Sequence, residues 1–258
     1  NEVAHCVIQS PAGSSVNTVP IFSSSSIDHH NAIVDNVIDG GSTGILFDGG
    51  GPANDEEGNT VSGNDIRGWF MNGIVFDDQK DGFILNNTIR SYEDSPGLGM
   101  DGIQSQFMEG GVISGNIVIV SALTSGQGIT LSWANTSGDS TLVSNNMVSI
   151  TSASGGQTIG LYTVNSRNLH FYYNSIHVIS GFSSSSRSLY STGTTTGGNK
   201  LVNNILVNRT GGLGAYISAP LNFSLLDHNA YYLPNSSSFG FFGAAVPDLA
   251  AWRIITDR

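Results

Sequence analysis

Two short acidic segments contain the residues best suited to chemistry. Asp48 follows Gly-Ile-Leu-Phe and Asp77 follows Gly-Ile-Val-Phe, so the two carboxylates occupy equivalent places in related stretches. If those stretches are neighbouring parallel strands, the backbones at Asp48 and Asp77 lie about 5 Å apart. Segments 48–57 and 77–81 together carry these acidic residues: Asp48, Asp55, Glu56, Glu57, Asp77, Asp78 and Asp81.

The charge of this acidic edge allows three interpretations. Carboxylates at close range repel one another unless they are solvated, protonated or bridged by a cation. The edge is therefore a solvated surface, a Ca²⁺ site with oxygen ligands, or a carboxylate pair in which Asp48, Asp77 or Asp78 acts as general acid or base in glycoside hydrolysis. The EF-hand spacing is absent, and the adjacent His29-His30 is expected to be a surface pair.

A second set of candidate binding residues shares one outward position in the same kind of stretch. Along the chain this position is occupied by Leu46, Val75, Gln104, Thr130, Tyr162, Tyr190 and Tyr216. Successive tyrosines predict a stacked aromatic strip, which is either a sugar-binding platform with Gln104 or a set of like residues that stabilises a parallel sheet. Elsewhere Ile117, Ile119, Met147, Ile205 and Val207 are expected to point outward together, which is typical of a contact with loops, another domain or another chain.

The elements that position these residues follow from an internal repeat of about 28 residues. Its constant position is occupied by Cys6, Asn36, Asn64, Asn87, Asn116, Asn146, Asn174, Asn204 and Asn229. Apolar residues stand three places before it and, nearly always, two places after it. Turn-forming residues such as Asp35, Gly63 and Asn86 directly precede it. A glycine-led stretch, such as Gly73-Ile74-Val75-Phe76, completes each repeat.

This pattern predicts an all-β fold, a single-stranded right-handed parallel β-helix of about nine coils with a stacked asparagine ladder. Cys6, in the ladder column, is expected to be buried as a small apolar residue. The β-helix should cover residues 1–233, and residues 234–258 should form a C-terminal loop and a short capping helix that begins after Pro247-Asp248 and uses Leu249, Trp252 and Ile255.

Charge and composition limit the partners. Residues 1–110 hold 16 acidic and three basic residues, whereas residues 111–258 are net +2. A chain with net charge −11 is not suited to nucleic acid or to an anionic membrane surface. One cysteine excludes an intrachain disulfide, and no stretch is apolar enough for membrane insertion. The chain begins without a signal peptide and inside a coil, and we expect it to be a module of a longer secreted protein with neighbouring domains.

The repeat resembles that of secreted right-handed parallel β-helix repeat proteins, the pectate-lyase-like superfold. Residues 224–232 (Ser-Leu-Leu-Asp-His-Asn-Ala-Tyr-Tyr) and 248–252 (Asp-Leu-Ala-Ala-Trp) are similar to the closing segment of β-helix modules in large secreted Bacteroidota proteins. The resemblance implies a secreted or cell-surface location. Of the polygalacturonase motifs only the Asp-Asp pair has a counterpart in this chain, which is Asp77-Asp78. The few basic residues do not suit a pectate-lyase-like site.

The sequence therefore favours a module that binds polysaccharide or a cell-surface glycan, or mediates adhesion, over an enzyme. It would use the acidic segments and Gln104, Tyr162, Tyr190 and Tyr216, and it would require no cofactor apart from the Ca²⁺ considered above. The alternative is a polysaccharide hydrolase or lyase that uses the acidic residues, and a structural spacer or phage-type fibre is the third reading.

Overall fold

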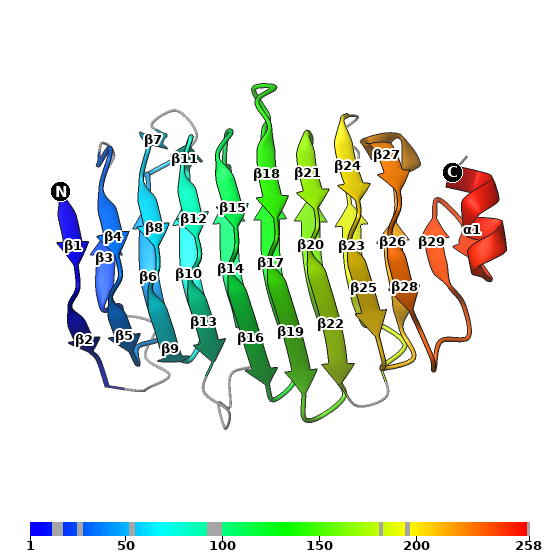
Figure 1. Cartoon of the computed structure of the whole chain (residues 1–258), viewed down its shortest axis with the longest axis horizontal. Coiled ribbons are helices and arrows are strands. Elements are labelled where there is room, and N and C mark those ends of the chain that lie inside the picture. Colours follow the sequence, from blue (N-terminus) through cyan, green and yellow to red (C-terminus); the bar gives the residue numbers. More distant parts are fainter. Residues whose placement is uncertain are drawn as a thin grey trace.

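The chain folds into one continuous right-handed parallel solenoid (Figure 1). The structure is a computed structural model that describes residues 1–11, 18–24, 28–51, 55–91, 100–180, 183–193 and 197–256. Three sheets run along the solenoid, and two of them contain nine strands each. Nine stacked strands correspond to about eight full turns, which confirms the predicted β-helix.

Each coil contributes one strand to each sheet, and each sheet is named here by its first and last strands. The β1–β27 sheet contains β1 (Glu2–Ala4), β4 (Ala32–Val34), β8 (Thr60–Ser62), β12 (Phe83–Leu85), β15 (Val112–Ser114), β18 (Thr141–Ser144), β21 (Leu169–Tyr172), β24 (Asn199–Val202) and β27 (Phe223–Asp227). The β2–β28 sheet contains β2 (Val7–Gln9), β5 (Val37–Asp39), β9 (Asp65–Trp69), β13 (Thr88–Ser91), β16 (Ile117–Ala122), β19 (Met147–Ser152), β22 (Ser175–Ser180), β25 (Ile205–Asn208) and β28 (Ala230–Tyr232).

The β3–β30 sheet is formed mainly by the glycine-led strands. It contains β3 (Ile21–Ser23), β6 (Thr43–Asp48), β10 (Asn72–Asp77), β14 (Met100–Gln106), β17 (Gly126–Ser132), β20 (Thr158–Val164), β23 (Arg187–Thr192), β26 (Leu213–Ile217), β29 (Gly240–Phe242) and β30 (Ala245–Val246). All pairings in these sheets are parallel except that of β29 with β30. A separate parallel pair joins β7 (Glu56–Glu57) to β11 (Gln79–Lys80).

The apolar columns of the repeat form the core. Ile84, Ile89 and Ile103, which come from the three strands of one coil, are completely buried, and their equivalents stack above and below them. Because equivalent residues pair between coils, each column continues along the solenoid as an aliphatic stack. The predicted inward positions are confirmed.

The asparagine ladder satisfies every polar atom of its buried side chains. Asn87 donates its backbone N–H and its Nδ2 to Asn116 Oδ1, both at 3.0 Å. Asn116 then donates its own Nδ2 to Asn146 Oδ1 and to the Ile84 carbonyl, both at 2.9 Å. The same pattern runs from Asn36 to Asn229. Each side chain is therefore held by the coils on both sides of it.

The residue before each ladder position has a left-handed backbone, which turns the chain from the first sheet to the second. Asn86 has φ of 55° and Asp35 has φ of 53°, as expected for turn-forming residues. Tyr173 and His228 adopt the same conformation although their residue types do not predict it. Cys6 follows such a turn and donates its N–H to Asn36 Oδ1, but its side chain is exposed. The expectation of a buried Cys6 is wrong, because the first coil is covered on one side only.

A second constraint explains the glycines that lead the strands of the β3–β30 sheet. A Cβ on Gly102 would lie 2.2 Å from Val118 Cγ1 and 2.8 Å from the Gly128 carbonyl oxygen. Gly73, Gly128 and Gly160 face β-branched residues of the next coil in the same way. The equivalent position in β23 is Ser188, and the corresponding residue of its next coil is Leu206, which has no branch at Cβ. Glycine is therefore needed where the packed neighbour is branched.

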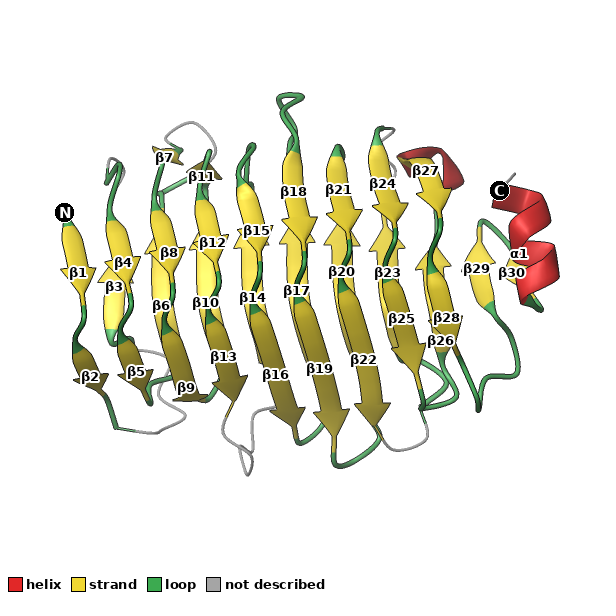
Figure 2. Cartoon of the chain, in the orientation of Figure 1, coloured by secondary structure: helices red, strands yellow, loops and turns green. Residues whose placement is uncertain are grey.

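The C-terminal end carries the predicted short helix, α1 (Leu249–Thr256), beside the last coil (Figure 2). The Asp248 side chain accepts a hydrogen bond from the Ala251 N–H. Trp252 is buried against Tyr231, Phe239 and Phe242, whereas Leu249 and Ile255 stay partly exposed. Residues 257–258 of the predicted C-terminal segment lie outside the described residues. No helix in the described ranges has the length and hydropathy that a membrane crossing requires.

We predict that Asn116→Ala lowers the free energy of unfolding by about 3 kcal/mol or more, because it removes buried hydrogen bonds to both neighbouring coils and leaves the Asn87 N–H without its acceptor. Urea denaturation followed by circular dichroism measures the change. Asn229→Ala, at the partly exposed end of the ladder, is the matched control and should cost clearly less. Equal losses for the two variants would contradict a ladder whose strength depends on burial.

We also predict that Gly102→Ser lowers the free energy of unfolding by about 1–3 kcal/mol through overpacking against Val118. The double variant Gly102→Ser/Val118→Leu reproduces the Ser188–Leu206 pair and should recover part of that loss. The measurement is a double-mutant cycle with Val118→Leu as the single reference. Strictly additive effects would show that the two positions do not pack as described.

Candidate functional site

An in-register row of side chains runs along the outer face of the β3–β30 sheet, and two of its members, Val75 and Thr130, are nearly covered by their neighbours. Strand register places Leu46, Val75, Gln104, Thr130, Tyr162, Tyr190 and Tyr216 at equivalent positions, as the sequence indicated. The structure extends the row to Phe22 at one end and Phe241 at the other. The face thus changes from apolar to polar to aromatic along the solenoid.

The aromatic end of the row is a tight stack. Tyr162 and Tyr190 lie 5.2 Å apart between ring centroids with planes inclined by 10°, and Tyr216 and Phe241 lie 4.5 Å apart at 8°. Tyr190 meets Tyr216 edge to face, and the Arg187 guanidinium lies 5.6 Å from the Tyr216 centroid. These ring faces are largely occupied by one another. A ligand would therefore contact the ring edges and hydroxyl groups.

The polar part of the face contains two carboxyl groups with shifted titration. Burial raises the pKa of Asp77 to about 7, although its carboxylate accepts a hydrogen bond of 2.7 Å from the Gln106 N–H. Burial also raises the pKa of Asp101 to about 7, against the opposing effect of a hydrogen bond from Thr130. Gln104 Nε2 lies 3.5 Å from Asp77 Oδ2. Both carboxyls therefore change charge near neutral pH, which is a feature of functional sites.

The two acidic segments lie side by side. Asp48 and Asp77 pair directly between β6 and β10, and β7 pairs with β11. The loop between them is more regular than the sequence suggested, because Glu57 and Lys80 occupy paired strand positions. Residues 52–54 of segment 48–57 lie outside the described residues.

Several of the acidic side chains point inward and not along a solvated edge. Glu56 is completely buried, and its Oε2 accepts hydrogen bonds from Asn59 Nδ2 at 3.0 Å and Gln79 Nε2 at 2.9 Å. Asp78 is buried in a left-handed turn with φ of 54°. Desolvation raises the pKa of Glu56, Asp78 and the partly buried Asp55. Glu57 and Asp81 remain exposed.

This arrangement spreads the predicted calcium ligands instead of gathering them. In the described ranges no three side chains from histidine, cysteine, aspartate or glutamate converge closely enough to hold a metal ion. Asp55 Oδ1, Glu56 Oε1 and Asp78 Oδ1 are buried and have no hydrogen-bond partner among the described residues. Calcium binding by the segments 48–57 and 77–81 stays a prediction.

Ligands for softer metals are also dispersed. All six histidines, Cys6 and the four methionines belong to the described part of the chain. His29 uses its Nδ1 to accept the Glu57 N–H, and the ring centroids of His29 and His30 are 6.3 Å apart. The exposed Cys6 thiol donates to the Ala4 carbonyl oxygen.

Two features of the acidic region had no signal in the sequence. Asp101 precedes its glycine-led motif, and its equivalents in the neighbouring coils are Asn72 and Gln127, so no acidic column marks it in the sequence. Glu109 is buried beside a cavity of about 430 Å³ and binds the hydroxyl groups of Thr136, at 2.7 Å, and Ser137. Thr136 and Ser137 lie on the loop that leads to the next coil. Asp101 points outward from a single strand and Ser137 lies in a loop, so neither belongs to a column that repeats along the sequence.

Comparison with known proteins identifies the family but no individual relative. No curated protein and no solved structure matches the chain significantly. The more specific likeness to modules of secreted Bacteroidota proteins stays a prediction. A family model described as "Periplasmic copper-binding protein (NosD)" matches residues 2–202, which is well over half of the chain. That span includes eight of the nine strands of the β1–β27 sheet and the acidic and tyrosine residues up to Tyr190, and the chain therefore belongs to the NosD family of parallel β-helix proteins.

Proposed function

We propose that this domain is an extracytoplasmic binding module that holds an extended polysaccharide along the outer face of its β3–β30 sheet. The observation that carries the proposal is the single row of polar and aromatic side chains, in register over successive coils. The periplasmic description of the family supports a location outside the cytoplasm.

A repeating surface suits a repeating ligand. Each coil adds one binding position about 4.8 Å from the last, so an extended chain can make similar contacts at several coils. Gln104 supplies an amide group, and the tyrosines supply hydroxyl groups beside apolar ring edges. Several weak contacts made together give a useful total affinity.

The charge of the same face selects among polysaccharides. Asp77 and Asp101 lie on it, and residues 1–110 carry a net charge of −13. Anionic uronate chains would be repelled at neutral and higher pH. The proposed ligand is therefore a neutral or amino-sugar polymer.

The second candidate is a polysaccharide-cleaving enzyme, favoured by the titration of one residue. A carboxyl with a pKa of about 7 can donate a proton near neutral pH, and Asp77 has one beside Asp48 on the neighbouring coil. Asp78 is the less suitable acid because it is buried in the turn.

Copper, which the family description names, does not fit the residues present. Copper sites in proteins use histidine, cysteine and methionine ligands in close groups. In the described residues the histidine, cysteine and acidic side chains form no group of three. No step of the proposed function uses copper.

For polysaccharide binding, we predict that Tyr190→Ala and Gln104→Ala each weaken association by about tenfold, because each removes contacts in the middle of the row. A glycan array followed by affinity electrophoresis measures binding, and a reducing-end assay measures cleavage. Tyr232→Ala, an exposed tyrosine on the β2–β28 sheet, is the matched control. Binding without cleavage supports the module, and cleavage that Asp77→Asn abolishes supports the enzyme. Absence of both outcomes would favour a structural spacer.

The free protein should also lose stability as pH rises. The folded-state pKa values of Asp77 and Asp101 are raised to about 7 from an unfolded value of 3.8. The protonated groups thus favour the folded state at pH 4, and this contribution disappears as pH rises through 7. We predict that the wild type loses on the order of 2 kcal/mol or more between pH 5 and pH 8.

The double variant Asp77→Asn/Asp101→Asn should reduce that slope, as measured by urea denaturation at each pH, and the part that stays belongs to Asp55, Glu56 and Asp78, whose pKa values are also raised. The control Asp139→Asn changes an acidic residue for which no comparable burial is seen and should keep the slope. An unchanged slope in the double variant would show that these two carboxyls titrate normally.

A further inference from the structure

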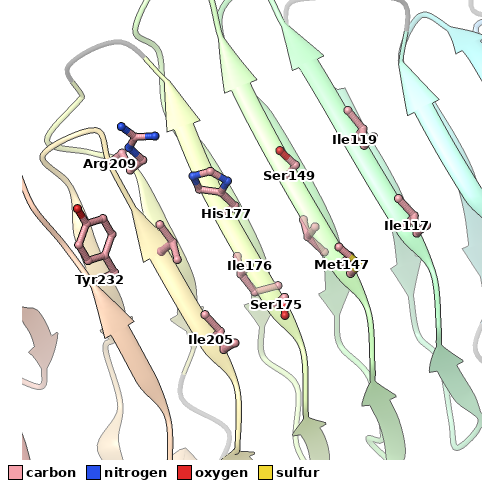
Figure 3. A pocket seen from close by; sticks show the side chains of 12 residues that line it. Ile117, Ile119, Met147, Ser149, Ser175, Ile176, His177, Ile205, Arg209 and Tyr232 are labelled. Atoms are coloured by element: carbon pink, nitrogen blue, oxygen red, sulfur yellow. The ribbon is translucent and has the colours of Figure 1, made fainter.

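A hollowed apolar strip crosses the β2–β28 sheet, and Figure 3 shows the side chains that line it. The proposed polysaccharide site lies on the β3–β30 sheet, which is a different face. We define the strip by Ile117, Ile119, Met147, Ile205, Val207 and Tyr232. Ile117, Met147, Ile205 and Tyr232 are 40%, 60%, 51% and 58% exposed, which is unusual for neighbouring large apolar residues. Ser149 and Ser175 lie among them, and the groove measures about 540 Å³.

Two arginines flank the strip. Arg90 pairs in register with Ile119 and lies beside the first strand of the strip, and Arg209 follows two residues after Val207 and lies at its side near Tyr232 (Figure 3). Both are exposed, and neither forms an ion pair among the described residues, whereas Arg67 on the next strand is paired with Asp39 and Asp65. The strands β16, β19, β22, β25 and β28 contain no acidic residue.

We propose that this strip is a docking site for an acidic amphipathic helix of a partner protein. The helix would place leucine-like side chains in the hollow over Ser149 and Ser175, and carboxylates at Arg90 and Arg209. The proposal is independent of polysaccharide binding, because it uses another sheet.

The sheet face favours a helix over an extended peptide. An extended peptide gains its main-chain hydrogen bonds at a sheet edge, and a face offers none. A helix satisfies its own backbone, and its turns rise 5.4 Å, close to the spacing of about 4.8 Å between coils. Four strand steps separate β13 from β25, which is about 19 Å, or about 13 helical residues.

Charge decides between this partner and two others. A second copy placed face to face would bring arginines together with no facing carboxylate on these strands. An anionic lipid surface would be repelled by the acidic residues 1–110, which carry net −13. An acidic helix supplies the missing carboxylates and covers only the strip.

The test pans a displayed library of random peptides of about 18 residues against the intact domain. The counter-screen uses Ile117→Ser/Met147→Ser/Ile205→Ser, which changes exposed side chains only. We expect enriched peptides with an amphipathic helical pattern and acidic ends, which bind this variant at least about 30-fold more weakly. Leu221→Ser, another exposed apolar residue, is the matched control and should bind like the wild type.

A charge-swap variant, Arg90→Glu/Arg209→Glu, keeps the apolar strip and tests the ends. It should weaken the acidic peptides at least about tenfold, so the proposal stays testable if the triple serine variant fails to fold. Peptides that are basic or neutral, or no peptides that discriminate the variants, would overturn the proposal. Strip-dependent sedimentation with phosphatidylglycerol vesicles, or strip-dependent dimerisation in analytical ultracentrifugation, would replace it with a lipid or self-association site.

Discussion

The buried amide of the ladder asparagine is the interaction on which the rest of the solenoid depends. In Asn116, for example, Oδ1 accepts two hydrogen bonds from Asn87 on the preceding coil. Its Nδ2 donates to the Ile84 carbonyl on that same coil and to Asn146 Oδ1 on the following coil. A polar group buried at this depth is costly when any bond is missing. Each coil is thereby locked in one register relative to the next, and the left-handed turn before each asparagine is held at the same corner.

Fixed register has electrostatic consequences on the outer faces. Parallel stacking places like positions over like positions, so Asp48 meets Asp77 and Tyr162 meets Tyr190. Tyrosines gain from such stacking, whereas carboxylates do not. Repulsion between the stacked carboxylates is reduced because burial raises the pKa of Asp77 to about 7, so that this side chain can hold a proton near neutral pH. The same register separates an acidic face from a face bordered by Arg90 and Arg209, which form no ion pair within the described part of the chain.

Periodic features could be predicted from the sequence, and non-periodic ones could not. The inward columns, the asparagine ladder, the row from Leu46 to Tyr216 and the outward apolar residues all repeat at a fixed offset from one position. The burial of Glu56 depends on Gln79 and Asn59, which meet it through the short β7–β11 pairing and leave no repeat signal. Asp101 has no acidic residue at the equivalent positions of the neighbouring coils. Cys6 is exposed because it lies on the first coil of the stack. Family membership accounts for the fold and a periplasmic setting, whereas the choice of ligand depends on the outer faces of this chain.

The pairing of a leading glycine with a branched residue on the following coil has a consequence for how such a domain changes length. Ladder neighbours lie 23 to 30 residues apart, so the loops absorb small changes of length, whereas an insertion within a strand would misalign both the amide ladder and the glycine contacts. A duplicated coil, in contrast, brings its own asparagine, its own glycine and its own branched neighbour. Evolution can therefore lengthen the molecule in whole coils, and each added coil extends every outer face by one position. The length of a surface that binds a long ligand therefore grows by one coil for each duplicated repeat of about 28 residues.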